Sequence, residues 1–91
     1  MNNLPTITAI LKKYGIKEAG VFGSVARGED KPTSDIDIMI QMGKTLNLFE
    51  YARLQIDLEK SLGRKVDLVS KNRIKPRLKP SIMKDIIYLT L

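Results

Sequence analysis

The chain has 91 residues, of which 43% are hydrophobic and 29% are charged, a balance typical of a folded globular domain and not of a disordered segment. It contains no cysteine and no histidine, which excludes disulfides, thiolate metal sites and imidazole bases; any metal must be a hard cation held by oxygen. The net charge of +6 favours anionic partners such as nucleotides, nucleic acid or an acidic protein surface.

Length and hydropathy predict one domain, spanning residues 1–91, with a single small core. No apolar run approaches the ~20 residues that cross a bilayer, and no cationic leader precedes an apolar stretch at the start. We therefore expect a cytoplasmic domain that does not enter a membrane.

The first third of the chain alternates helical and extended patterns. Pro5 and Thr6 suit a helix start, and Gly15 and Gly28 suit helix ends. The predicted elements are a helix over 5–14 with Ile7, Ile10 and Leu11 on one stripe, a strand over 17–23, one or two helical turns over 24–29, and a polar loop over 29–34.

The clearest strand is predicted over residues 34–41, where apolar and polar side chains alternate with a period of two. Three isoleucines occupy one set of positions, and Asp35 and Asp37 occupy the other. We expect the isoleucines to face the core and both aspartates to emerge from the opposite face of the sheet.

The rest of the chain predicts two more helices and one more strand, joined by a basic connector. A GKT segment at 43–45 leads into the first of these helices. A helix is predicted from about 46 to 62, with Leu48, Phe49, Ala52, Ile56 and Leu62 near helical spacing. A strand is predicted over 64–70, with Asp67 on the face opposite Val66 and Leu68. A connector over 71–80, broken by Pro76 and Pro80, then leads to a helix over 81–89 on Ile82, Ile86 and Leu89. This order predicts an α/β (α+β) fold, in which a small sheet is covered by helices mainly on one face.

Three carboxylates are candidates for a cation site. Asp35 and Asp37 share a face and lie about 6.5–7 Å apart at their Cα atoms, so they can converge on one cation or bridge two. Asp67 adds a third carboxylate from another strand. Oxygen-only ligands suit Mg²⁺, and a pair of such ions can stabilise both the attacking and the leaving oxygen of an in-line displacement.

The Gly-Ser pair that precedes these aspartates is suited to phosphate. Gly23 lets the backbone approach a phosphate closely, and Ser24 supplies hydroxyl and N–H donors. Arg27 can add a fixed positive charge. Taken singly, each of these residues is more often plain surface than a ligand, but the combination of a Gly-Ser turn, Asp-x-Asp on a strand and a third acid on another strand is much rarer.

These residues resemble the signature of the DNA polymerase beta-like nucleotidyltransferases. The segment GVFGSVARGEDKPTSDIDIMI contains the family's Gly-Ser, a spacer of about ten residues and Asp-x-Asp between apolar residues, and KVDLVS resembles the strand that carries the third acid. The short length, the ARGE after Gly-Ser and the later KPRL resemble specifically the minimal nucleotidyltransferases of bacteria and archaea. The match covers nearly the whole chain.

The resemblance implies a mixed β-sheet flanked by helices and the transfer of a nucleoside monophosphate, expected to be AMP from ATP, to a hydroxyl. It implies that Asp35 and Asp37 bind two Mg²⁺ ions, that Asp67 binds the catalytic ion and helps to activate the acceptor, and that Gly23 and Ser24 hold the triphosphate with help from Arg27. Minimal members accompany a helical HEPN-domain toxin, which they adenylylate on a tyrosine as its antitoxin. We expect no second domain for acceptor recognition, so the hypothesis requires a partner protein.

Two other functions stay open at this stage. The chain could be a binding module that neutralises its helical partner by occlusion, because a domain this small leaves apolar helix surface available for pairing. Direct nucleic-acid binding is supported by the positive charge alone and is the weakest of the three hypotheses. The sequence leaves open which nucleoside triphosphate is used and what the oligomeric state is.

Overall fold

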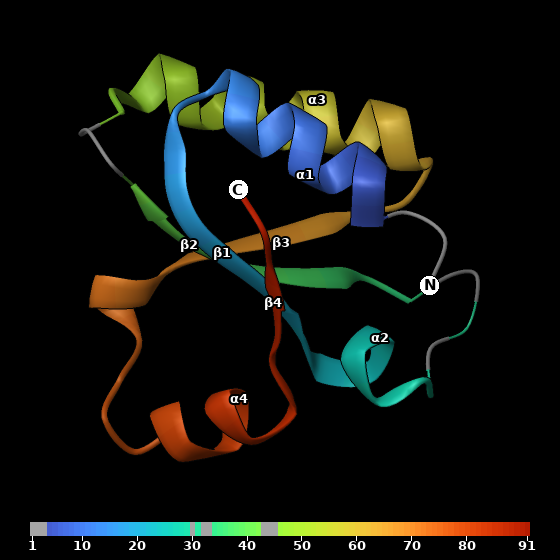
Figure 1. The fold of residues 1–91 in the computed structure, drawn as a ribbon, viewed down its shortest axis with the longest axis vertical. Helices are drawn as coiled ribbons and strands as arrows, with labels where there is room; N and C mark the ends of the chain where they lie inside the picture. The colour runs from blue at the N-terminus through green and yellow to red at the C-terminus, as the bar shows by residue number, and fades with distance from the viewer. Residues whose placement is uncertain (1–3, 30, 32–33, 43–45) are drawn as a thin grey trace.

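The computed structural model describes residues 4–29, 31, 34–42 and 46–91, and a four-stranded sheet lies at its centre (Figure 1). The strands are β1 (Ile16–Phe22), β2 (Ile36–Met42), β3 (Val66–Ser70) and β4 (Ile87–Leu89), in the spatial order β3-β2-β1-β4. β1 pairs antiparallel with both β2 and β4, whereas β2 pairs parallel with β3. The sheet is therefore mixed, as the resemblance implied.

The two longer helices cover one face of this sheet. α1 (Leu4–Lys13) and α3 (Leu48–Leu62) pack side by side above it, as Figure 1 shows. The short α2 (Gly23–Arg27) follows β1 directly, and a 3-10 turn η1 (Lys71–Arg73) and α4 (Lys79–Asp85) lie toward the other face. The prediction that helices pack mainly on one face is confirmed for α1 and α3. No helix in the described ranges is long and apolar enough to cross a membrane.

The core lies between the sheet and these two helices. Ile36, Ile38 and Ile40 of β2 are fully buried, as their alternation predicted, and they belong to one apolar cluster with Leu54 and Leu58 of α3. Complete burial of a side chain of this size stabilises the fold by about 1.5–3 kcal/mol. Because β2 is tied in this way on one face, its other set of side chains is held on the opposite face.

The buried stripe of α3 differs from the predicted one. Leu48, Phe49 and Ile56 are 81%, 83% and 50% exposed, whereas Leu54 and Leu58 are fully buried. The helix carries two apolar stripes at helical spacing, and periodicity alone cannot say which one faces the sheet. The start is fixed by Asn47, whose side chain accepts a hydrogen bond from the Glu50 N–H in a capping box. The predicted GKT connector at 43–45 lies outside the described residues.

The C-terminal segment was predicted wrongly as one helix over 81–89. The structure has a shorter helix, α4, followed by strand β4, which pairs with β1 over three residues. Pro80 does not break the connector but lies in the first turn of α4, where its missing N–H costs nothing. The helix ends at Asp85, because Ile86 after it is extended. The β-branched and aromatic residues that follow complete the sheet at the open edge of β1.

The other edge of the sheet, β3, is covered by side chains from α3. Tyr51 Oη donates to the carbonyl of Leu68 at 3.0 Å, and Gln55 Nε2 donates to the carbonyl of Val66 at 3.2 Å. The N–H of Val66 donates to Glu59 at 2.9 Å. These contacts satisfy backbone groups that an edge strand otherwise leaves unpaired, and they disfavour the addition of another strand there.

Candidate active site

The turn between β1 and α2 holds the predicted phosphate-binding pair. β1 ends at Phe22 and α2 begins at Gly23, which has a φ of +77°, with Ser24 half-buried beside it. Such a φ is unfavourable for any residue with a β-carbon. The glycine is therefore required by the backbone conformation before any ligand is considered.

Strand pairing brings Asp37 directly against this turn. Phe22 and Asp37 are partners in the β1–β2 register. A β-carbon added to Gly23 would overlap with Oδ2 of Asp37. The absence of a side chain at residue 23 therefore allows the chain to approach the carboxylate closely, and the predicted phosphate turn and the predicted metal ligand form one site.

The parallel pairing of β2 with β3 adds the third acid. Asp37 and Asp67 are direct register partners, and neighbouring strands are about 4.8 Å apart. Asp35 immediately precedes β2, which begins at Ile36 and not at the predicted residue 34. Asp35 and Asp67 are exposed and Asp37 is half-buried. The three predicted carboxylates thus lie together at one end of the sheet.

The charges of these carboxylates act on one another. Burial raises the pKa of Asp37, the charges of Asp67 and Asp35 raise it further, and the charge of Arg27 partly offsets the increase. Within the described residues, no lysine or arginine forms an ion pair with any of the three aspartates. Their ionised forms are therefore left to repel one another unless a cation binds.

The donor set fits a hard divalent cation, because all three candidates are carboxylates. In the described part of the chain, however, no three acidic side chains are gathered closely enough to hold a metal ion as they stand. The chemistry of the donors fits a metal, and their side chains would need to turn toward a common point to bind one.

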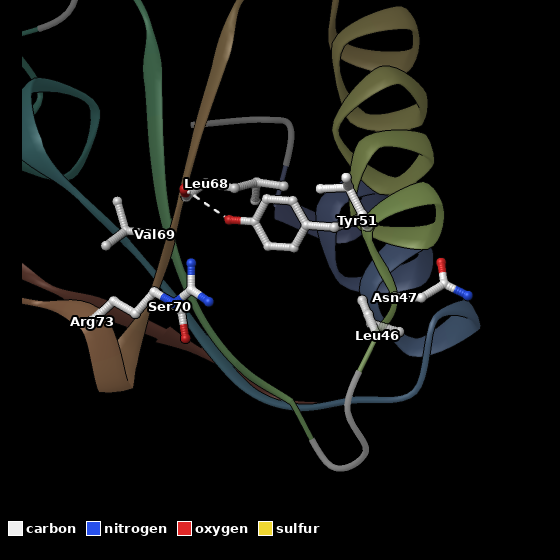
Figure 2. Close-up of a pocket in the computed structure, with 8 residues that line it drawn as sticks. Leu46, Asn47, Tyr51, Leu68, Val69, Ser70 and Arg73 are labelled. Atoms are coloured by element: carbon white, nitrogen blue, oxygen red, sulfur yellow. Dashed lines mark hydrogen bonds between the residues drawn. The ribbon is translucent and has the colours of Figure 1, made fainter.

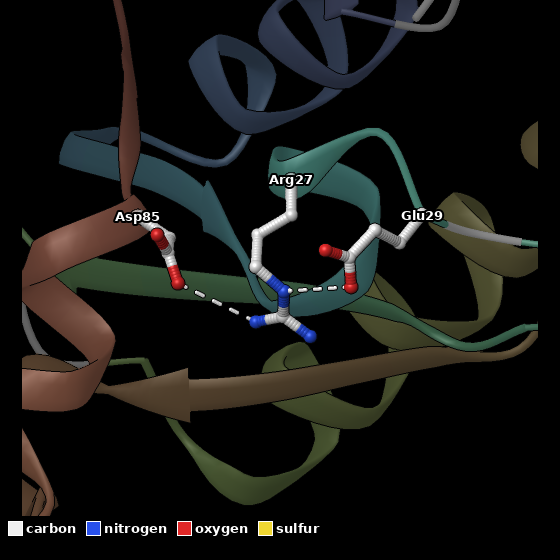
Figure 3. A network of polar contacts seen from close by, with 3 residues as sticks. All are labelled: Arg27, Glu29 and Asp85. Carbon is white, nitrogen blue, oxygen red and sulfur yellow. Dashed lines mark hydrogen bonds and ion pairs between the residues drawn. The ribbon is translucent and has the colours of Figure 1, made fainter.

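Arg27 lies at the side of this site in a small ionic network (Figure 3). Its Nε is 3.2 Å from Glu29 Oε2, and its Nη1 is 3.4 Å from Asp85 Oδ2, so the network joins α2 to the end of α4. The side chain of Arg27 is 42% exposed, and its charge reaches Asp37. Sequence analysis identified Arg27 but not Asp85, because contacts across 58 positions leave no local signal.

A groove of about 530 Å³ lies at the β3 edge (Figure 2), and none of the three aspartates lines it. Tyr51 spans it from α3 to β3, and burial raises the pKa of Tyr51 while the charge of Arg73 lowers it and that of Asp67 raises it. Sequence analysis did not predict this feature. The lining residues are Leu46, Asn47, Leu48, Tyr51, Leu68, Val69, Ser70 and Arg73.

Comparison with protein-family models assigns the chain to a family. Residues 5–90 match the model described as "Polymerase beta, Nucleotidyltransferase". The chain belongs to this nucleotidyltransferase family. The match covers almost all of its length and includes the turn at Gly23 and all three aspartates, so the family predicted from the sequence is confirmed. Nucleotidyltransferases of this superfamily generally use a divalent metal.

Curated relatives narrow the activity class. The protein adenylyltransferase MntA of Thermococcus cleftensis is 36% identical over 78 residues, which cover 86% of this chain and 79% of the relative. A Methanocaldococcus jannaschii protein with the provisional description of protein adenylyltransferase is 44% identical over 81 residues, covering 89% of this chain and 87% of its own length. The predicted enzyme class, a nucleotidyltransferase related to protein adenylyltransferases, is thus confirmed.

Solved structures share this fold. A chain provisionally described as a minimal nucleotidyltransferase has a TM-score of 0.81 and 34% identity, covering 93% of this chain and 87% of that one. A chain from a toxin–antitoxin crystal structure with AMP-PNP has a TM-score of 0.84 and 26% identity, covering 97% of this chain and 73% of its own. Both similarities extend across nearly all of the nucleotidyltransferase.

The close contact at Gly23 predicts unequal effects of two matched substitutions. Gly28 has a φ of +72° but open space around it. Gly28→Ala should therefore lower the free energy of unfolding by only about 1–2 kcal/mol, because a β-carbon is unfavourable in this backbone conformation. Gly23→Ala should lose about 1–3 kcal/mol more, because Asp37 must move. Urea denaturation measures both losses, and equal losses would show that Asp37 does not crowd the turn.

The raised pKa of Asp37 predicts how stability changes with pH. In metal-free buffer the unfolded chain loses this proton at a lower pH than the folded chain, so the contribution of Asp37 to stability is lost as pH rises through its folded pKa. Asp37→Asn should therefore raise the melting temperature at pH 7 and have a smaller effect near pH 4. Thermal scans at both pH values test this expectation, which fails if the substitution lowers the melting temperature at pH 7.

Proposed function

We propose that this chain is a Mg²⁺-dependent protein adenylyltransferase that transfers AMP from ATP to a hydroxyl of a HEPN-domain toxin and thereby acts as its antitoxin. The observation that carries the proposal is the contact between the turn at Gly23 and the carboxylate of Asp37, with Asp67 as the next neighbour. A phosphate-binding turn packed on acidic strand ends is suited to phosphoryl chemistry and has no evident use in a plain binding module.

The similarity to known proteins supports the substrate and the partner. The relative in Thermococcus cleftensis is named a protein adenylyltransferase, and the toxin–antitoxin structure with 26% identity contains the ATP analogue AMP-PNP. The proposal treats residues 1–91 as a single minimal domain that acts in the cytoplasm. Because the relative in Thermococcus cleftensis is named a protein adenylyltransferase, the acceptor is expected to be a separate protein.

Each site residue has a role in the proposed reaction. Gly23 and Ser24 bind the triphosphate through backbone N–H groups and the serine hydroxyl. Asp35 and Asp37 would hold both metal ions, and Asp67 would hold the catalytic one. Two Mg²⁺ ions, when bound, supply positive charge that stabilises the attacking and leaving oxygens.

The transfer forms one bond and breaks one. The acceptor hydroxyl oxygen bonds to the α-phosphorus of ATP, and the bond from that phosphorus to the oxygen bridging to the β-phosphate breaks, which releases pyrophosphate. The hydroxyl proton passes to the carboxylate of Asp67, which lies on the outermost strand and is exposed to an incoming acceptor. The orientation of these groups by β2 and β3 sets the in-line geometry.

A second candidate function is neutralisation by occlusion, and one observation favours a binding role. Leu48 and Phe49, adjacent at the start of α3, are 81% and 83% exposed, which is unusual for two large apolar side chains. A binding surface and a transferase site can exist on one chain. The question is therefore which of the two neutralises the toxin.

Replacement of Asp37 by asparagine separates the two functions. Asp37→Asn should lower AMP transfer by at least about a hundredfold, because one metal-binding carboxylate is lost from the reacting centre. Incorporation of label from α-labelled ATP into the toxin measures transfer, and Asp57→Asn, on α3 away from the site, is the matched control. If Asp37→Asn labels the toxin as strongly as the wild type does, the mechanism is excluded. If Asp37→Asn transfers no label but still neutralises the toxin fully, neutralisation by occlusion is favoured.

Arg27 should contribute to ATP binding. Its contacts with Glu29 and Asp85 are exposed, so a triphosphate can compete for the guanidinium. Arg27→Ala is expected to raise the KM for ATP about tenfold, and Arg53→Ala, which removes an exposed cation from α3, should not. Initial rates over a range of ATP concentrations provide the measurement. An unchanged KM would assign Arg27 to the link between α2 and α4 alone.

A further inference from the structure

The sheet leaves one side of the aspartates open to an acceptor. Asp67 lies on β3, the outermost strand, and is exposed. On the opposite side of Asp37 lie β1 and α2, and the ion pair between Arg27 and Asp85 joins α2 to α4 there (Figures 1 and 3). An acceptor protein therefore has its clearest approach along the β3 edge.

The groove described above lies along this same edge. Its lining includes Leu68, the residue directly after Asp67, and continues through Ser70 to Arg73 in η1. Asp67 points to the opposite face of β3 from Leu68, and three residues of strand span about 10 Å, so a segment seated in the groove reaches Asp67 around the free edge of β3. Figure 2 shows the groove open between α3 and the end of β3. Its position thus suits a docking site for whatever carries the hydroxyl.

The wall of the groove is mostly apolar. Leu46, Tyr51, Leu68 and Val69 contribute to it, and Leu48 stands at its rim with Phe49 next in the chain. Two adjacent apolar side chains exposed by more than 80% are poorly accommodated by water and favour a partner that covers them.

The backbone of the β3 edge is already engaged near this groove. The carbonyls of Val66 and Leu68 accept hydrogen bonds from Gln55 and Tyr51, so a partner cannot add a strand along this stretch without displacing them. The occupant must instead present side chains. An amphipathic helix with an apolar face meets that requirement.

The positive charge beside the groove favours an occupant with acidic residues on the flank of its apolar face. Residues 71–79 contain five lysines and arginines and no acidic residue, and Arg73 from this segment lines the groove. A helix that packs its apolar face on Leu48 and Tyr51 would bring its flank against these cations. Acidic residues on that flank would be attracted, and basic ones would be repelled.

We infer that this groove docks an amphipathic helix of the acceptor protein, apolar on one face and acidic on the flank, and thereby positions the acceptor hydroxyl at Asp67. The inference rests on the proposed adenylyltransferase function and adds to it the surface that selects the acceptor. It separates ATP recognition, at the turn after β1, from acceptor recognition, at the edge of β3.

Two pairs of matched variants test the docking surface, with the HEPN-domain protein of the same organism as acceptor. The double variant Leu48→Ser and Phe49→Ser removes the exposed apolar pair at the start of α3, of which Leu48 lines the groove. Ile56→Ser, two turns along the same helix, is its control. Arg73→Glu reverses a charge in the groove, and Arg77→Glu reverses one in the same basic segment outside it. Steady-state transfer with each substrate varied in turn gives separate KM values for acceptor and ATP.

We expect the groove variants to raise the KM for the acceptor at least about tenfold with an unchanged KM for ATP, and the controls to change neither by more than about twofold. An acceptor KM that is unchanged while transfer proceeds would overturn the docking inference and leave the proposed function intact. The docking inference would also be overturned if sedimentation showed that the groove variants lose self-association while their KM for the acceptor is unchanged. The occupant of the groove would then be a second copy of this chain.

A wild-type protein that transfers no AMP would instead contradict the proposed function. Calorimetric binding of the same HEPN-domain protein then tests the docking surface independently of catalysis. Weaker binding by the Leu48→Ser and Phe49→Ser variant than by Ile56→Ser would support the groove as an interaction surface. Equal binding by these two variants would overturn it.

Discussion

The site depends on the antiparallel pairing of β1 with β2. This pairing sets Phe22 opposite Asp37, so the turn that follows β1 begins beside the carboxylate. A shift of one residue in the register would turn every side chain of β2 to the other face, moving Asp37 to the face packed by α1 and α3 and the isoleucines away from it. Since Ile36, Ile38 and Ile40 are fully buried, the hydrophobic effect opposes that shift strongly. The apolar face of β2 thus specifies the position of the acidic face.

The same arrangement places mutually repelling carboxylates close together, which is electrostatically unfavourable in the free protein. Asp37 is half-buried beside Asp67 and near Asp35, and its raised pKa reflects both burial and like charge. A protein selected for stability alone has no reason to place three carboxylates at neighbouring strand ends. A cation that binds there together with a polyphosphate would relieve the repulsion among the carboxylates. The repulsion in the free protein therefore favours binding. The exposed apolar pair Leu48 and Phe49 is similar in this respect, because its exposure is unfavourable only while no partner covers it.

The sequence predicted the buried face of an element correctly where the apolar pattern allowed only one arrangement. It failed where the same local pattern was compatible with two ways of packing. The alternation in β2 allowed only one choice of face for the three isoleucines. In α3, by contrast, Leu48 and Ile56 lie on one apolar stripe and Leu54 and Leu58 on another, and the prediction selected the wrong one. The segment after Ile86 was apolar enough for either a helix or a strand, and its pairing with β1 decided the outcome. The roles of Gly23, Ser24, Arg27 and the three aspartates remain predictions.

By itself, the sequence determined the family, the class of chemistry, and the local elements whose periodicity was unambiguous, since these depend on residue types and short spacings. Only the tertiary structure decided that Asp37 contacts the turn at Gly23, that Asp67 is the register partner of Asp37, that Asp85 engages Arg27, and that a groove opens along β3. Each of these features joins residues that are distant in the chain. Such contacts are fixed by strand register and by which helix face is buried, and both result from the packing of the whole domain.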